Sequence, residues 1–200
     1  MNKVMATLLA VAMAGTASTA SAEGFTGDTK LACEAILCLS TGSRPSECSP
    51  PIRRYFSISA RRLSDTIKAR KNFLNLCPSA SQDDSMRTLI DSIANGAGRC
   101  DAAALNVSLR QWRHFDDDGR PTVIRNALPS HCGAYGGHGY TDQANGTVAR
   151  YVGDPENGGF WADPADYDAA LARYNAQLRD RGGWNGNGEG GVRWRADSGR

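Results

Sequence analysis

The chain has 200 residues, enough for one domain with a sizeable hydrophobic core. Its 23 lysines and arginines nearly balance its 21 aspartates and glutamates. This near-neutral charge gives no support to nucleic acid or an anionic membrane surface as the main partner, and it argues against strong nonspecific DNA binding.

The first residues have the pattern of a secretory signal peptide. Met-Asn-Lys precedes an uncharged run of apolar and small residues at 4–15, and Ala20-Ser21-Ala22 fits the A-x-A cleavage site. We therefore expect residues 1–22 to be removed after Ala22, which leaves a soluble periplasmic protein. No later stretch approaches the ~18 apolar residues of a membrane span, so we expect no transmembrane segment in the mature chain.

Six cysteines lie between residues 33 and 132. An even number in an exported chain favours a disulfide framework over a metal site or a set of nucleophiles. The close pairs Cys33/Cys38 and His131/Cys132 fit no usual zinc spacing. We therefore expect no metal, no cofactor and six structural disulfide cysteines: Cys33, Cys38, Cys48, Cys77, Cys100 and Cys132.

The first predicted helix covers residues 29–39, with Asp28 or Thr29 near its amino end and apolar residues at helical spacing. It contains both Cys33 and Cys38. Five residues along an intact helix separate two Cα atoms by roughly 8 to 9 Å, which exceeds the ~7 Å limit for a disulfide. The two cysteines should therefore pair with different partners and clamp this helix to two neighbours.

The next segments alternate between loops and helices. Residues 40–51 are rich in Ser, Gly and Pro and predict a loop. Residues 52–76 predict one amphipathic helix or a pair of helices with a break at Ser64-Asp65, ended by Cys77-Pro78. A helix at 83–94, capped by Ser81 or Asp83, a weaker helix at 101–115 and a short strand at 122–124 follow.

The last third of the chain is richer in glycine. Residues 133–159 predict a loop, and residues 164–181 predict a helix capped by Asp163, with Tyr167, Ala170, Leu171, Tyr174 and Leu178 facing inward. Residues 182–200 include seven glycines and predict a disordered tail. The expected fold is mainly α: a disulfide-stapled helical domain at 23–132, a loop-rich extension at 133–181 and the glycine-rich tail.

A set of motifs between residues 31 and 78 resembles the TrbM/KikA family of conjugal transfer proteins. The motifs are LACEAILCLS at 31–40, Arg-Pro at 44–45, Glu-Cys at 47–48, RYFSI at 54–58 and RKNFLNLCP at 70–78. The resemblance implies a small exported protein that accompanies the mating-pair formation genes of a conjugative plasmid, whose products assemble a type IV secretion system. It supplies no catalytic or binding residues.

Several sharper hypotheses fail on their residues. The acidic turn at 116–119 is no EF-hand loop, because His114 and Arg125 would occupy ligand positions one and twelve. A cysteine hydrolase using Cys132 with His131 lacks an obvious free thiol. Arg54, Arg61 and Lys68, spaced seven apart, suggest a basic helix face, for which a solvated surface is the better interpretation. The tryptophans Trp184 and Trp194 are typical of recognition segments that become ordered on a partner, and a tail without such a role explains them at least as well.

The sequence therefore predicts a non-enzymatic accessory of plasmid conjugal transfer that binds or stabilises envelope components of a type IV secretion system. No specific nucleic-acid binding is expected. The alternative is a peptidoglycan-acting enzyme, similar to a lytic transglycosylase, with Glu34 as its general acid. Glu34 is the one glutamate of the mature chain with a plausibly sheltered position, although no second carboxylate accompanies it.

Overall fold

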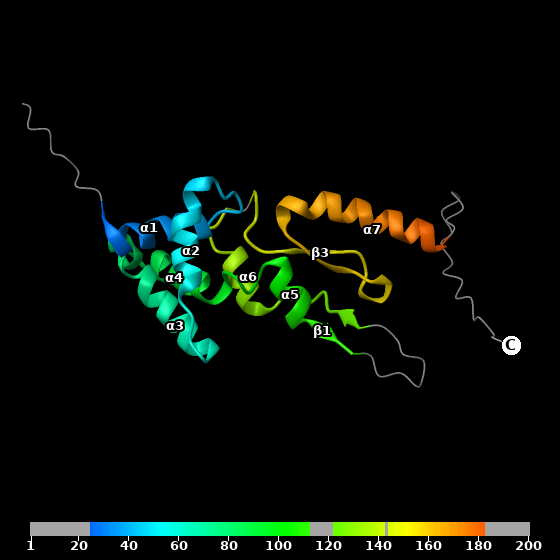
Figure 1. Ribbon diagram of the computed structural model, residues 1–200, viewed down its shortest axis with the longest axis horizontal. Helices are drawn as coiled ribbons and strands as arrows, with labels where there is room; N and C mark the ends of the chain where they lie inside the picture. Colours follow the sequence, from blue (N-terminus) through cyan, green and yellow to red (C-terminus); the bar gives the residue numbers. More distant parts are fainter. Residues whose placement is uncertain (1–24, 113–121, 143, 183–200) are drawn as a thin grey trace, which may run out of the picture.

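Figure 1 shows the computed structural model, which describes residues 25–112, 122–142 and 144–182. These residues form seven α-helices, four short strands and four 3-10 helices, and this confirms the mainly α prediction. The molecule is elongated, with α1 to α4 at one end, α5 and α6 in the middle and the β3–β4 hairpin with α7 at the other end (Figure 1). The predicted signal peptide, the acidic turn at 116–119 and the two tail tryptophans lie outside the described residues.

Helix α1 (Gly27–Leu39) begins two residues earlier than predicted and ends where predicted. Its amino end follows Thr26, whose side chain makes no capping hydrogen bond. Ala32, Ala35 and Leu39 are fully buried, and they pack α1 against α2 and α3. Because these small and apolar residues recur every three or four positions, one face of α1 enters the core.

The segment predicted as one helix or two forms two: α2 (Ser49–Ser57) and α3 (Leu63–Leu74). The break lies at 58–62, and Ser64-Asp65 belong to the first turn of α3. The Thr66 hydroxyl oxygen accepts a hydrogen bond from the Ala60 amide at 2.8 Å, which fixes this connection. The predicted basic face is therefore divided between α2, the connection and α3, instead of following one helix.

Helices α4 (Asp84–Gly96) and α6 (Ser130–Gly136) cross closely in the centre. The Asp83 carboxylate accepts from the Met86 amide at 2.7 Å and caps α4, as predicted. A Cβ atom added to Gly96 would lie 2.5 Å from Tyr135, so only glycine permits this approach. The buried Tyr135 hydroxyl donates to the Leu39 carbonyl and joins α6 to α1.

Helix α5 (Ala102–Ser108) is shorter than the predicted helix at 101–115. Its carboxyl end leads directly into β1 (Arg110–Gln111), which pairs antiparallel with β2 (Val123–Ile124). The short strand predicted at 122–124 is therefore confirmed as β2. The Asp101 carboxylate caps α5 by accepting from the Ala104 amide at 3.0 Å.

The segment predicted as loop at 133–159 contains most of α6 and the strand β3 (Arg150–Val152), which pairs antiparallel with β4 (Phe160–Ala162). Helix α7 (Tyr167–Gly182) packs against β3. Ala170 and Tyr174 are buried with Val152 and Ala162, and this confirms the predicted inward face of α7. The remaining short elements are 3-10 helices at Ser46–Cys48, Pro78–Ser81, Pro155–Asn157 and Pro164–Asp166.

Two polar contacts join the hairpin to the helices. The Asn106 side chain donates to the Trp161 carbonyl and accepts from the Trp161 amide, both at 2.8 Å. The Asp163 carboxylate, predicted to cap the last helix, instead accepts from the Ala102 amide at 2.8 Å. Trp161 is 4% exposed and belongs to the main core, which therefore includes side chains from both sides of residue 132.

Candidate functional site

Three disulfides join all six cysteines: Cys33–Cys77, Cys38–Cys48 and Cys100–Cys132. Their Cα–Cα distances are 4.9, 5.6 and 5.4 Å, within the usual range for this bond. Cys33 and Cys38 pair with different partners, as helix geometry predicts. The first bond ties α1 to the segment that follows α3, and the second ties it to the 3-10 helix before α2.

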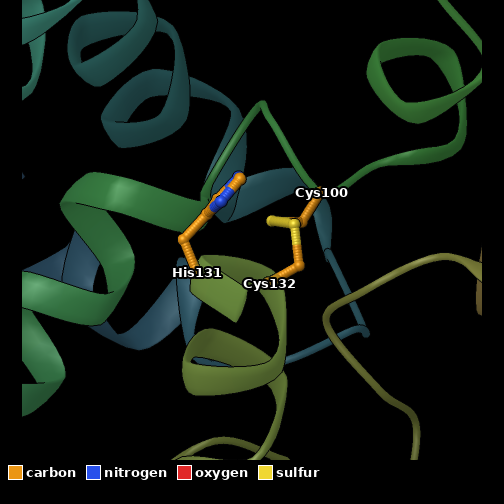
Figure 2. A group of neighbouring side chains, drawn as sticks. All are labelled: Cys100, His131 and Cys132. Carbon is orange, nitrogen blue, oxygen red and sulfur yellow. A yellow bond between two sulfur atoms is a disulfide. The ribbon is translucent and has the colours of Figure 1, made fainter. Parts of the chain in front are cut away.

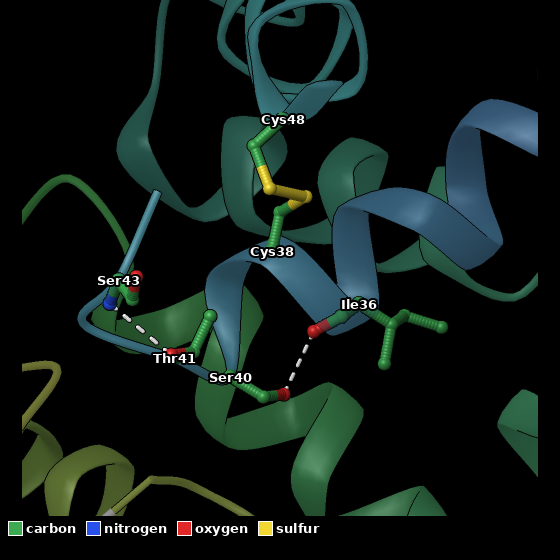
Figure 3. The surroundings of a disulfide bond; sticks show 6 residues. All are labelled: Ile36, Cys38, Ser40, Thr41, Ser43 and Cys48. Carbon is green, nitrogen blue, oxygen red and sulfur yellow. Dashed lines mark hydrogen bonds between the residues drawn. A yellow bond between two sulfur atoms is a disulfide. The ribbon is translucent and has the colours of Figure 1, made fainter. Parts of the chain in front are cut away.

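Figure 3 shows the end of α1 around the Cys38–Cys48 bond. The Ser40 hydroxyl donates to the Ile36 carbonyl at 2.7 Å, and the Ser43 amide donates to the Thr41 hydroxyl oxygen at 3.1 Å. The Thr41 hydroxyl in turn donates to the Asp142 carboxylate at 3.0 Å. The loop predicted at 40–51 is therefore held by a covalent bond and by hydrogen bonds.

Cys100, His131 and Cys132 form a cluster whose side-chain ligand atoms lie within 4.8 Å of one another (Figure 2). Two cysteines and a histidine are typical zinc ligands, but cysteine binds zinc as a thiolate. Both sulfur atoms here belong to one disulfide, and both cysteines are fully buried. The oxidised cluster therefore offers neither a thiolate ligand nor the nucleophile that a cysteine hydrolase needs.

His131 differs from the two cysteines because its ring is partly accessible. Burial, with a smaller contribution from the positive charge of Arg99, lowers the pKa of His131 below its ordinary value of 6.5. The imidazole is therefore neutral at pH 7, and its nitrogens provide one hydrogen-bond donor and one acceptor.

Glu34 lies on α1 beside Lys30, with 3.7 Å between its carboxylate oxygen and the lysine nitrogen. Its side chain is 38% exposed. A glutamate that acts as a general acid in glycoside hydrolysis needs an apolar, sheltered setting that keeps it protonated. The structure gives Glu34 a solvated ion pair instead of that shelter.

Arg54 of the predicted basic face, and two further cations of α3, have partners inside the fold. Arg54 donates two hydrogen bonds to the Asp28 carboxylate, at 3.0 and 2.7 Å, and these bonds lower the pKa of Asp28. Arg70 stacks 4.9 Å from the Tyr55 ring centre and donates to the Ile58 carbonyl at 3.1 Å. Lys71 pairs with an aspartate of α4. These contacts assign much of the positive charge of this segment to holding α1, α2, α3 and α4 together.

A shallow groove of about 360 Å³ lies between the start of α3, helix α5 and the start of α6. We call it the α3–α5–α6 groove. It combines apolar side chains with two basic ones, and its lining residues are Leu63, Arg99, Ala104, Leu105, Ser108, Leu109, Pro129 and His131. Sequence reasoning missed this groove because its residues are spread over nearly seventy positions and share no motif.

A model of the TrbM family matches residues 25–175. The chain belongs to the TrbM family. The match begins just before α1 and ends within α7, so the family pattern covers the disulfide-linked helices, the β3–β4 hairpin and the groove. Neither a curated protein nor a solved structure matches the chain significantly.

TrbM membership makes this a protein related to conjugal transfer. Its three disulfides are consistent with an exported protein, because such bonds persist in oxidising compartments. Within the described parts of this TrbM protein, every helix is too short or too polar to cross a membrane.

Proposed function

We propose that this TrbM-family protein is an exported accessory of mating-pair formation that works in the periplasm. It binds or stabilises envelope components of a conjugative type IV secretion system and catalyses no reaction. The observation that carries the proposal is the full pairing of the six cysteines within a conjugal transfer family. A cytosolic protein would keep these thiols reduced, since glutathione and thioredoxin oppose disulfides there.

The arrangement of the bonds supports a role in binding. Two disulfides fix α1 against the segments before α2 and after α3, and the third joins the segment after α4 to α6. A surface held in this way loses little conformational entropy when a partner binds, and this favours recognition by a preformed site. The TrbM family is not known as an enzyme family, and Glu34 has a solvated ion pair.

The test is plasmid transfer from donor cells that carry an in-frame deletion of the gene. We expect transfer frequency to fall and to recover with a copy that retains residues 1–22. A copy that begins at Glu23 should give no recovery, because it stays in the reducing cytosol. Full transfer without the gene, or full recovery by the copy without the leader, would contradict the proposal.

Location can be measured independently of transfer. The protein should appear in the fraction released by osmotic shock, and its six cysteines should resist a thiol-alkylating reagent until a reductant is added. The matched control is the copy that lacks residues 1–22, whose thiols should react without a reductant. Recovery of the full-length product only in the cytosol with reactive thiols would contradict export.

A further inference from the structure

The α3–α5–α6 groove has an apolar lining that ranges from buried at its floor to exposed at its rim. Leu105 is 1% exposed and belongs to the main core, and Leu109 is half-buried against the same core. Leu63, at the first position of α3, is 54% exposed, although leucine is a residue that folding usually buries. Pro129 forms the opposite side, and the neighbouring Leu128 is 42% exposed. An apolar surface of this kind, bordered by polar groups, is typical of an interaction site.

Among the described residues that line the groove, the charged side chain is basic. Arg99 lies there beside the neutral imidazole of His131, and none of the described lining residues is acidic. Arg61 and Arg62 directly precede Leu63 and are exposed. The nearby carboxylate of Asp101 already accepts the capping hydrogen bond of α5. The basic groups therefore attract a ligand that brings negative charge, and the attraction increases both the rate and the specificity of association.

The size of the groove limits what it can accept. A volume of about 360 Å³ is at the lower end of the range for ligand pockets. It accommodates a few side chains that project from one peptide segment, and the helix-in-groove mode of recognition uses such anchors. A basic segment would meet Arg99 and the Arg61-Arg62 pair, so like charges would repel it.

We propose that the α3–α5–α6 groove binds an acidic segment of a protein partner, whose apolar side chains contact Leu63, Leu105 and Leu109 and whose carboxylates pair with Arg99 and Arg62. The proposal rests on the proposed function, because it assigns a chemistry to the envelope partner. His131 adds a neutral hydrogen-bonding group at the edge of the same surface.

The binding test uses the mature, oxidised protein and a fluorescein-labelled helical peptide with leucines along one face and glutamates along the other. Fluorescence anisotropy should show saturable binding that weakens as salt is added. Two matched peptides, one with lysine for each glutamate and one with serine for each leucine, should bind at least about tenfold more weakly. Absence of saturable binding by the acidic peptide, or equal binding by the lysine peptide, would overturn the proposal.

Variants of the protein locate the contact. Leu63→Ser and Arg62→Glu alter exposed side chains, so both should fold normally and bind the acidic peptide about tenfold more weakly. Leu37→Ser on α1, which is 71% exposed, and Arg53→Glu on α2 are the matched controls and should bind like the wild type. Equal losses in the controls would overturn the assignment to the groove. A wild-type dimer that the Leu63→Ser substitution converts to a monomer would also overturn the proposal, because the groove would then bind a second copy of this chain.

Transfer assays separate this proposal from the proposed function. Donors that express Leu63→Ser or Arg62→Glu should transfer the plasmid less often than donors that express Leu37→Ser or Arg53→Glu at equal periplasmic levels. If the gene deletion lowers transfer and both groove variants restore it fully, the groove proposal fails and the proposed function stands. If the deletion leaves transfer unchanged, the proposed function fails whatever the peptide assay shows.

Discussion

Removal of the Cys33–Cys77 bond should destabilise the protein more than removal of the Cys38–Cys48 bond. The two bonds close chain segments of very different length, since their cysteines are 44 and 10 residues apart. In the chain-entropy model, a bond restricts the unfolded chain more when it closes a longer loop. At 25 °C this gives about 4 kcal/mol for Cys33–Cys77 and about 2.7 kcal/mol for Cys38–Cys48. Changing both cysteines of a pair to alanine should therefore produce losses that differ by about 1.3 kcal/mol.

Urea unfolding of the oxidised protein, followed by far-ultraviolet circular dichroism, measures both losses. The m-value should increase in each double variant, and more in Cys33→Ala/Cys77→Ala, because the unfolded chain expands further without the longer cross-link. Lost sulfur packing does not explain a greater loss for Cys33–Cys77, because Cys33 is only partly buried whereas Cys77, Cys38 and Cys48 are all buried. An equal or greater loss for the Cys38–Cys48 pair, with unchanged m-values, would refute the reasoning from loop length.

Three further predictions concern single residues. Gly96→Ala should lower stability by about 1–3 kcal/mol, because the new Cβ would lie 2.5 Å from the α6 tyrosine. Gly133→Ala, which has open space around its Cβ, should instead stabilise α6 by about 0.5–1 kcal/mol, and thermal unfolding compares the two variants. Asn106→Ala should cost about 2–3 kcal/mol and raise hydrogen exchange in β4, because both backbone groups of Trp161 lose their side-chain partner. Stability should fall as pH decreases from 6.5 towards the lowered pKa of His131, because in that window the His131 imidazole binds a proton in the unfolded chain but not in the folded one. Urea titrations at several pH values measure this dependence, and His131→Gln should abolish it.

The helical framework follows from local patterns in the sequence. The inward face of α7 is predicted because Ala170 and Tyr174 recur at helical spacing, and both are buried. The Asp83 cap is predicted because an aspartate immediately precedes an apolar helical pattern, and its carboxylate accepts from the Met86 amide. The separation of Cys33 from Cys38 follows from helix geometry alone. In each case the sequence pattern that indicates the feature extends over only a few helical turns.

Other features depend on contacts between distant residues. The β3–β4 hairpin is missed because each strand has three residues, too few to show an alternating pattern. Asp163 resembles a helix cap in the sequence, but its carboxylate binds the Ala102 amide, a group 61 positions away. The break between α2 and α3 depends on the Thr66 side chain, which turns back to Ala60. The groove is the extreme case, because Leu63 and Pro129 become neighbours only in the folded chain.

The nested order of the first two disulfides has a consequence for how the protein matures. A chain that emerges amino end first and is oxidised in order of appearance would join Cys33 to Cys38 and Cys48 to Cys77. The native bonds instead enclose Cys38–Cys48 within Cys33–Cys77, so Cys33 pairs past its two nearest cysteines, whereas Cys38–Cys48 and Cys100–Cys132 each join consecutive cysteines. Thiol–disulfide exchange must correct the premature pairs, a reaction that takes seconds to hours and that isomerases accelerate. The yield of native protein should therefore depend on a disulfide isomerase, and α1 itself directs the correction, because the helix cannot form while its two cysteines are joined.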